Sequence, residues 1–164
     1  MPGPHTLAET EREVEKRLGK LPIDYASMAV ASNLFRAANA VRNHLERTVL
    51  SENDLSWTAF VVLWVTWIWE PIETRQIALE GGFSKATLTG VLSTLEGRGW
   101  VSREKSQVDG RLVLVRMTPA GRTLMTGLFP AFNKQEQHVA APVPADRRQD
   151  FAEMLRLITS NVEK

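Results

Sequence analysis

Residues 84–98 read SKATLTGVLSTLEGR, and residues 100–118 read WVSREKSQVDGRLVLVRMT. The first stretch carries apolar side chains at helical spacing, at Leu88, Val91, Leu92 and Leu95. Its first residue, Ser84, is a preferred helix N-cap. The second stretch has two runs of bulky side chains on either side of an Asp-Gly turn signal. These patterns predict a helix over 84–98 and a β-hairpin with strands at 100–105 and 112–117.

A shorter helix is predicted before the helix 84–98. We expect Thr74 to cap it and Glu80 to stand near its end, with the glycine pair 81–82 making a tight turn. Two short helices joined by a glycine turn are a helix-turn-helix candidate. Together with the hairpin, residues 74–117 have the element order of a winged helix-turn-helix.

The predicted polar face of the helix 84–98 is built from short side chains. A surface helix that needed only solubility would normally carry Glu, Lys and Gln there. Small side chains let a helix enter a groove, and hydroxyl groups can bond base edges or phosphates, while the amides capped by Ser84 add a phosphate site. The alternative is a helix of weak propensity that buries both faces inside the protein. Helical projection places the following residues on this face or beside it: Lys85, Ala86, Thr87, Thr89, Gly90, Ser93, Thr94 and Gly97.

The predicted hairpin is cationic around its loop. Asp109 stands two residues before Arg111, where its carboxylate can brace the guanidinium or the turn. An arginine at a hairpin tip suits a narrow minor groove, where the negative potential is enhanced. The alternative is a solvated hairpin whose charges only keep it soluble. The four cations are Arg103, Lys105, Arg111 and Arg116, and the candidate DNA-binding residues are Ser84, Lys85, Ala86, Thr87, Thr89, Gly90, Ser93, Thr94, Arg98, Arg103, Lys105, Asp109 and Arg111.

The remaining periodicities predict helices on both sides of this segment. Residues 6–18 form a short charged helix, and residues 24–50 form one of roughly seven turns. The second of these is too long for one small domain to cover, so we expect it to pack against a second subunit, the alternative being a long helix that stays partly exposed. Two further helices are expected at 119–138, opened by Thr118-Pro119, and at 145–162.

The most apolar predicted helix covers residues 55–69. Its cap is Asn53 or Asp54, and Pro71 stops it. Apolar side chains surround it almost completely, so it is expected to be the central element of the core.

Length and composition favour one globular domain. The chain has 164 residues, 43% hydrophobic and 24% charged. It has no cysteine, which excludes a disulfide framework, a cysteine zinc site and a thiol redox sensor. The apolar run 60–69 is too short to cross a bilayer of about 30 Å, and residues 1–20 have no apolar signal core, so we expect a cytoplasmic protein with no membrane partner.

Charge is uneven along the chain. Residues 84–122 carry seven basic and three acidic side chains, a net charge of +4, whereas the whole chain has a net charge of only +1. This asymmetry favours one electropositive face for a polyanion. No metal, cofactor or catalytic site is expected, because His5, His44 and His138 lack metal-ligand spacing and the sequence has no phosphate loop and no G-x-S-x-G elbow.

Four motifs resemble those of the MarR family of winged-helix transcriptional regulators: SKATLT at 84–89, LEGRGWV at 95–101, DGR at 109–111 and LVRMTPAG at 114–121. The resemblance extends in outline over residues 24–162. It implies a mainly α fold with a small β-hairpin, in which a winged helix-turn-helix lobe is joined to an N- and C-terminal helical dimerisation lobe. The implied division of the single chain 1–164 is an N-terminal extension at 1–22, dimerisation helices at 24–50 and 119–162, and a DNA-binding lobe at 55–118.

The resemblance also implies a function. A homodimer would bind double-stranded DNA at a pseudo-palindromic operator, with the helix 84–98 in the major groove and Arg111 in or near the minor groove. Two-fold symmetry then separates the half-sites by roughly 34 Å. Many such proteins are repressors released by small aromatic or phenolic anions. The candidate ligand-binding residues are Asn39, Arg42, His44, Trp57, Trp64 and Trp67.

Three alternatives stay open at this stage. The tryptophans can belong to the core instead of a ligand site, since helical proteins bury most of their aromatic side chains. The winged helix can be a protein-association module without DNA binding. The tryptophan-rich helix can also belong to a small-molecule-binding or catalytic helical protein.

Overall fold

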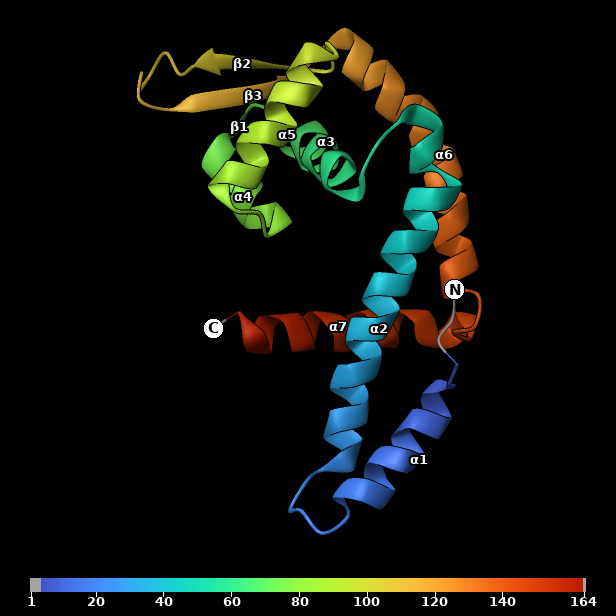
Figure 1. Ribbon diagram of the computed structural model, residues 1–164. Coiled ribbons are helices and arrows are strands. Elements are labelled where there is room, and N and C mark those ends of the chain that lie inside the picture. Colours follow the sequence, from blue (N-terminus) through green and yellow to red (C-terminus); the bar gives the residue numbers. More distant parts are fainter. Residues whose placement is uncertain (1–3, 164) are drawn as a thin grey trace. The chain divides into compact units, whose positions relative to one another are not determined.

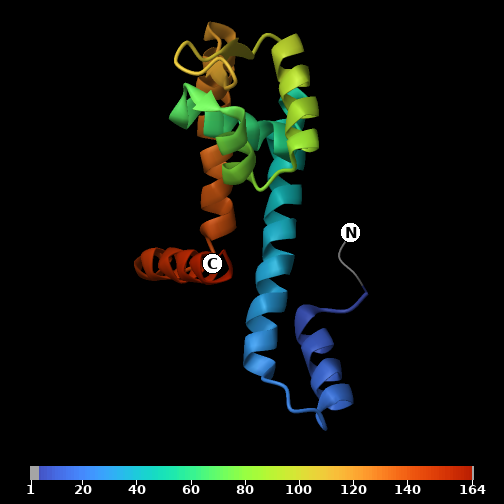
Figure 2. The same ribbon diagram turned by 90° about the vertical axis from the view of Figure 1, so that its left-hand side faces the viewer.

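The computed structural model describes residues 4–163 and is mainly helical, with one small antiparallel sheet (Figures 1 and 2). This confirms the predicted fold class. The chain divides into two compact units, one ending at Asn43 and the other beginning at His44. The elements are α1 (Leu7–Leu18), α2 (Tyr25–Thr48), η1 (Leu50–Asn53), α3 (Trp57–Trp69), β1 (Ile72–Glu73), α4 (Thr74–Gly81), α5 (Lys85–Gly97), β2 (Val101–Lys105), β3 (Val113–Met117), α6 (Pro119–Ala140), η2 (Ala145–Arg147) and α7 (Arg148–Val162).

The first unit consists of α1 and most of α2, which lie side by side in Figures 1 and 2. Thr6 and Glu9 form a capping box, in which the Glu9 amide donates to the Thr6 hydroxyl at 3.2 Å and the Thr6 amide donates to the Glu9 carboxylate at 2.7 Å. The Asn33 amide group donates to Glu11 Oε1 at 2.8 Å and links the two helices. The predicted short charged helix is therefore present, and residues 1–3 of the predicted extension lie outside the described residues.

Helix α3 is the centre of the second unit, as the sequence predicts. It contacts α4, α5, α6 and β3, and its buried side chains include Phe60, Val62 and Leu63. The predicted cap was wrong: the Ser56 hydroxyl accepts the Ala59 amide at 3.2 Å. Asn53, one of the two predicted caps, belongs to the 3₁₀ turn η1. Asp54, the other, ends that turn in the left-handed conformation, with φ of 50°.

The sheet contains a strand that was not predicted. Strand β1 pairs with β3, with Ile72 opposite Val115, and the strand order is β1-β3-β2. Its two residues are too few to show an alternating pattern. Because the backbone is extended through Glu73, that residue is the N-cap of α4, and the predicted cap Thr74 is the first helical residue.

The predicted hairpin is confirmed. Strands β2 and β3 pair from Val101 opposite Met117 to Lys105 opposite Val113. The Leu112 amide donates to the Asp109 carbonyl oxygen at 2.9 Å, which closes the turn that contains the Asp-Gly signal.

Helix α6 begins in close contact with the hairpin. The Thr118 hydroxyl caps it by accepting the Gly121 amide at 3.0 Å, as predicted, and the Thr118 amide donates to the Trp100 carbonyl oxygen. A Cβ atom at Gly121 would lie 2.0 Å from that carbonyl oxygen. Only glycine lets α6 start this close to the backbone that precedes β2.

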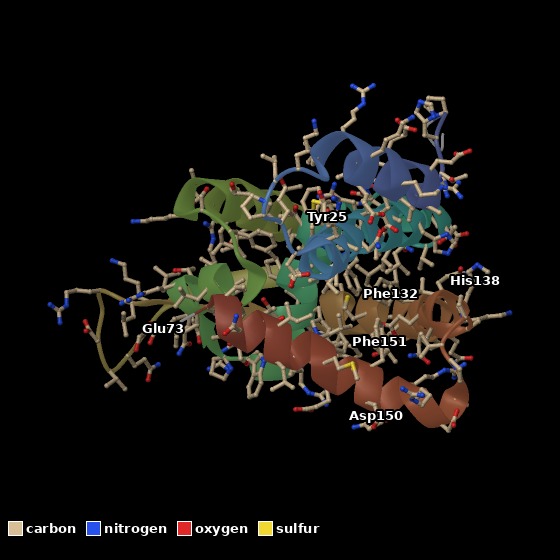
Figure 3. All side chains as sticks on the ribbon, turned by 90° about the horizontal axis from the view of Figure 1, so that it is seen from below. Tyr25, Glu73, Phe132, His138, Asp150 and Phe151 are labelled. Atoms are coloured by element: carbon tan, nitrogen blue, oxygen red, sulfur yellow. The ribbon has the colours of Figure 1, made fainter. Side chains whose placement is uncertain are left out.

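Helix α7 carries an exposed apolar stripe. Figure 3 labels Phe151 on this helix, and Phe151, Met154 and Leu157 are 48%, 52% and 61% exposed. None of the helices in the described part of the chain is both long and apolar enough to span a membrane.

Candidate nucleic-acid interface

Helix α5 presents its short side chains to solvent. Leu88, Leu92 and Leu95 are buried and Val91 is half-buried, so the predicted apolar stripe faces the core. The opposite face is exposed at each predicted position: Lys85, Ala86, Thr87, Thr89, Gly90, Ser93, Thr94 and Gly97. This excludes the alternative in which the helix buries both faces.

The hydroxyl groups of this face are ordered by the helix itself. The Ser84 hydroxyl accepts the Thr87 amide at 3.1 Å and caps α5, as predicted. Thr89 donates to the Lys85 carbonyl oxygen at 2.8 Å, and Thr94 donates to the Gly90 carbonyl oxygen at 3.1 Å. Since these two hydroxyl groups already use their donors, their oxygen atoms remain available as acceptors.

Arg98 makes contacts within the protein that the sequence analysis did not predict. Its guanidinium donates to the carbonyl oxygens of Asp54 at 2.9 Å and of Asn53 at 3.1 Å, and it lies 3.9 Å from the ring centroid of Trp100. These contacts tie the end of α5 to η1, and the residue remains exposed. A DNA contact of Arg98 stays a prediction.

Arg103 joins the hairpin to α5. Its Nε donates to Glu96 Oε2 at 3.0 Å and its backbone amide donates to Glu96 Oε1 at 3.2 Å. The hydrogen bonds from Arg103 hold the pKa of Glu96 below its usual range. The pair orients the hairpin against α5, and a DNA contact of Arg103 stays a prediction.

Arg111 stands at the hairpin turn with its side chain 90% exposed. Its Nε and Nη2 donate to the two carboxylate oxygens of Asp109 at 3.1 and 3.0 Å, and its amide donates to Asp109 Oδ1 at 3.0 Å. This is the predicted brace. The side-chain hydrogen bond to Arg111 lowers the pKa of Asp109, and the same contact raises the pKa of Arg111.

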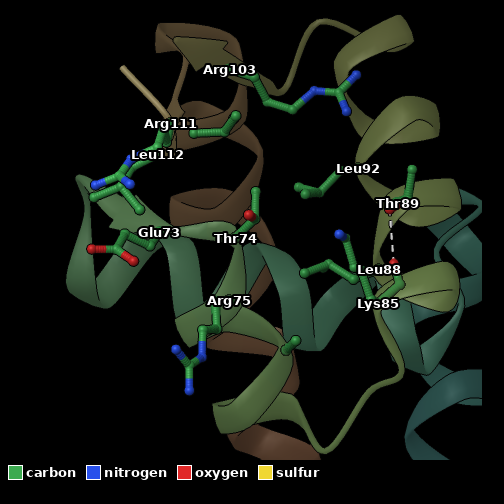
Figure 4. Close-up of a pocket in the computed structure, with 12 residues that line it drawn as sticks. Glu73, Thr74, Arg75, Lys85, Leu88, Thr89, Leu92, Arg103, Arg111 and Leu112 are labelled. Carbon is green, nitrogen blue, oxygen red and sulfur yellow. Dashed lines mark hydrogen bonds between the residues drawn. The ribbon is translucent and has the colours of Figure 1, made fainter. Parts of the chain in front are cut away.

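A groove of about 550 Å³ lies between α4, α5 and the hairpin (Figure 4). It brings together four of the predicted residues, Lys85, Thr89, Arg103 and Arg111. It also includes Arg75 of α4, which the sequence analysis missed. The sequence did carry a signal for Arg75, because this residue lies on the predicted first helix of the helix-turn-helix. In this motif the first helix crosses the DNA backbone.

Glu70, a second residue that was missed, supports the base of the hairpin. It ends α3, its side chain is 10% exposed, and its Oε2 accepts the amide of buried Met117 at 2.7 Å. Its other carboxylate oxygen pairs with Arg122 of α6. One carboxylate therefore joins α3, β3 and α6.

The candidate ligand residues are distributed over both units. Asn39 and Arg42 belong to the first unit, where the Asn39 side chain donates to the Phe35 carbonyl oxygen at 3.0 Å. In the second unit, His44 hydrogen-bonds Gln135 at 2.9 Å and stacks on His138 with a centroid distance of 5.4 Å.

The three candidate tryptophans pack against α6. Trp57 stacks on Phe132 with a centroid distance of 6.5 Å. Trp64 stacks on Phe129 at 4.7 Å, and Trp67 meets the same ring edge-on at 6.0 Å. These contacts agree with the alternative in which the tryptophans belong to the core. Trp64 and Trp67 are nevertheless only half-buried.

An exposed helix of short side chains beside a cationic hairpin defines a winged-helix DNA-binding protein. The sequence profile of the MarR family matches residues 55–113. The HTH-type transcriptional regulator YwaE of Bacillus subtilis is 33% identical over 159 residues, which cover 95% of this chain and 93% of YwaE. The chain belongs to the MarR family of transcriptional regulators and is a DNA-binding regulator, not an enzyme.

Two solved structures illustrate the likeness. Sco3205 of Streptomyces coelicolor, a MarR family regulator crystallised with DNA, has a TM-score of 0.78 at 16% identity, covering 87% of this chain and 91% of its own, and so shows the same fold. BpsR of Bordetella bronchiseptica, whose structure concerns regulation of its DNA binding by 6-hydroxynicotinic acid, has a TM-score of 0.71 at 25% identity. The match covers 79% of this chain and 92% of BpsR.

Proposed function

We propose that this regulator is a ligand-responsive repressor that binds a pseudo-palindromic operator as a homodimer. The exposed face of α5 carries the proposal, because its short side chains allow the helix backbone to approach base edges. The helix enters the major groove with these residues toward the DNA: Ser84, Lys85, Ala86, Thr87, Thr89, Gly90, Ser93 and Thr94.

The hairpin acts as the wing of this assembly. Arg111 enters or borders the minor groove, where its exposed guanidinium meets an enhanced negative potential. Asp109 orients Arg111 and the turn, and exposed Lys105 adds a phosphate contact. Arg103 supports the wing through Glu96.

The helices at 24–50 and 119–162 form the dimer. The exposed apolar stripe of α7, together with a hollow of about 290 Å³ beside Pro144, Phe151 and Met154, supports a surface that a second copy covers. Two-fold symmetry then presents two copies of α5 to half-sites about 34 Å apart. Light scattering of the purified chain is expected to give twice the mass of one chain, and Phe151→Asp is expected to shift the population toward monomer.

A small aromatic or phenolic anion is the proposed effector. Support comes from the half-buried faces of Trp64 and Trp67 and from BpsR, whose DNA binding is regulated by 6-hydroxynicotinic acid, a hydroxylated pyridine carboxylic acid. A coupling free energy of about 1 to 3 kcal/mol between ligand and DNA is enough to change operator occupancy markedly. Titration with 6-hydroxynicotinic acid is expected to quench tryptophan fluorescence and release bound DNA. A titration that shows neither effect would contradict the proposal that this compound is an effector.

Footprinting on the DNA beside the protein's own gene tests the operator. The expected result is a protected segment with two related half-sites one helical turn apart, and increased expression of the neighbouring gene when the regulator is deleted. Weak binding that does not depend on salt would instead favour the protein-association alternative.

A further inference from the structure

A nearly buried carboxylate stands where the wing meets the helices. Glu70 ends α3, and its side chain is 10% exposed. Its Oε2 accepts the Met117 amide at 2.7 Å, and its Oε1 pairs with Arg122 in the first turn of α6. Both oxygen atoms are therefore used, one by the last residue of β3 and the other by α6.

The bond to Met117 takes the place of a ladder bond in the sheet. Strand β1 begins at Ile72, opposite Val115, and the residue before it, Pro71, has no amide hydrogen with which to extend the pairing. Two residues further along this register, the Glu70 side chain meets the Met117 amide. It supplies the acceptor that a longer β1 would have supplied to the end of β3.

Few other contacts fix the direction of the wing. Strand β2 is buried only at Val101 and β3 only at Val115 and Met117, and the hairpin projects beyond the helices (Figure 1). The pair between Arg103 and Glu96 holds β2 against α5. The direction of β3 therefore depends strongly on the carboxylate at its inner end.

The wing is long enough to amplify a change at its base. Arg111 precedes Met117 by six residues, which is a span of at most about 20 Å along an extended chain. A tilt of about 10° at the base would move the tip by about 3 Å. A displacement of that size separates a hydrogen-bond donor from its acceptor, because such bonds hold over a range of only about half an ångström.

We propose that Glu70 is a positioning residue for DNA binding, because it sets the angle at which the wing meets the DNA. Its carboxylate is nearly buried, so it acts on DNA through β3 and not by contact. Arg122 supports this role by pairing with the oxygen atom that β3 does not use. The inference rests on the proposed docking of the wing at the minor groove.

A double-mutant cycle on DNA affinity tests this role. Anisotropy titrations with the duplex protected in the footprint compare the unmodified chain, Glu70→Ala, Arg111→Ala and the double variant, at a temperature at which circular dichroism shows each chain folded. Glu70→Ala is expected to weaken binding about threefold or more when Arg111 is present, and by less than about 1.5-fold in the Arg111→Ala background. The direction of the change is informative, because removing a carboxylate near DNA would by itself strengthen binding.

Two further variants make the cycle decisive. Arg122→Ala removes a half-exposed partner of Glu70, and it takes the place of Glu70→Ala in the cycle if that variant does not fold. It is expected to weaken binding about twofold or more, again only when Arg111 is present. Glu70→Gln keeps an oxygen acceptor for the Met117 amide and is expected to retain most of the affinity that Glu70→Ala loses.

A matched control removes a carboxylate far from the wing in the sequence. Glu13→Ala deletes the exposed partner of Lys16 on α1 and is expected to leave DNA affinity unchanged. Equal losses with and without Arg111, or no loss at all, overturn the inference about Glu70. If Arg111→Ala itself has no effect, the proposed docking of the wing is refuted instead.

Discussion

Replacing Glu70 by alanine tests how the base of the wing is held. The Glu70 side chain is 10% exposed and accepts the amide of Met117, which is itself buried. Truncation leaves that amide without its acceptor, at a cost of about 1 to 3 kcal/mol. The lost pair with half-exposed Arg122 contributes a further amount of about 0 to 1 kcal/mol.

The expected loss of unfolding free energy for Glu70→Ala is therefore about 1 to 4 kcal/mol. For a chain of this size each kcal/mol lowers Tm by about 2 to 4 °C, so the variant should melt about 2 to 16 °C lower. Denaturant titration and thermal melting measure both quantities, and all samples are kept at one protein concentration because self-association would make Tm depend on concentration.

Two comparison variants separate the contributions. Glu70→Gln keeps an oxygen acceptor for the Met117 amide and is expected to cost about 1 kcal/mol or less. Glu104→Ala removes an exposed carboxylate that pairs with Arg116 on the wing, with an expected cost near zero to about 1 kcal/mol. If Glu70→Ala proves no worse than Glu104→Ala, the buried hydrogen bond does not hold the wing as argued.

Four further predictions concern the wing, α5 and the start of α6. Arg111→Ala is expected to weaken operator binding more than about tenfold while the dimer stays folded, and an unchanged affinity in an anisotropy titration would contradict the wing assignment. Thr89→Glu should abolish operator binding through repulsion between the new carboxylate and the phosphates, whereas retained binding would show that α5 does not enter the groove. Gly121→Ala should destabilise the protein by about 1 to 3 kcal/mol or more, because its Cβ would stand 2.0 Å from the Trp100 carbonyl oxygen, and an unaltered denaturation midpoint would refute this. Since the hydrogen bonds from Arg111 lower the pKa of Asp109, the brace is present above the ordinary pKa of an aspartate and is lost as pH falls through the lower native value; an NMR titration should show the Asp109 pKa rising in Arg111→Ala.

The sequence predicted those features of the candidate interface that depend on residues close together along the chain. The N-cap Ser84, the leucine stripe of α5 and the Asp-Gly turn each depend on residues a few positions apart, and each is present in the structure. The exposure of Thr89 and Ser93 follows from the same helical periodicity. These features could be derived before any fold was known, because hydrogen bonds within one helix or one turn determine them.

Other features depend on residues that are distant in the sequence. Glu70 reaches Met117 and Arg122, and the guanidinium of Arg98 is taken up by carbonyl oxygens of Asn53 and Asp54. Strand β1 forms by pairing with β3. That pairing keeps the backbone extended through Glu73, so Glu73 and not the predicted Thr74 is the N-cap of α4.

By itself the amino-acid sequence determined the helices, the hairpin, the basic segment and the face of α5 that meets solvent, because periodicity, caps and turns act over a few residues. Only the tertiary structure decided where most of these cations find partners. Arg98 and Arg103 bond to acceptors on other elements, while Arg75 lies at the groove because β1, just before it, pairs with β3 about forty residues along the chain. Residue type gives the charge of a side chain, but tertiary packing determines which acceptor that side chain meets.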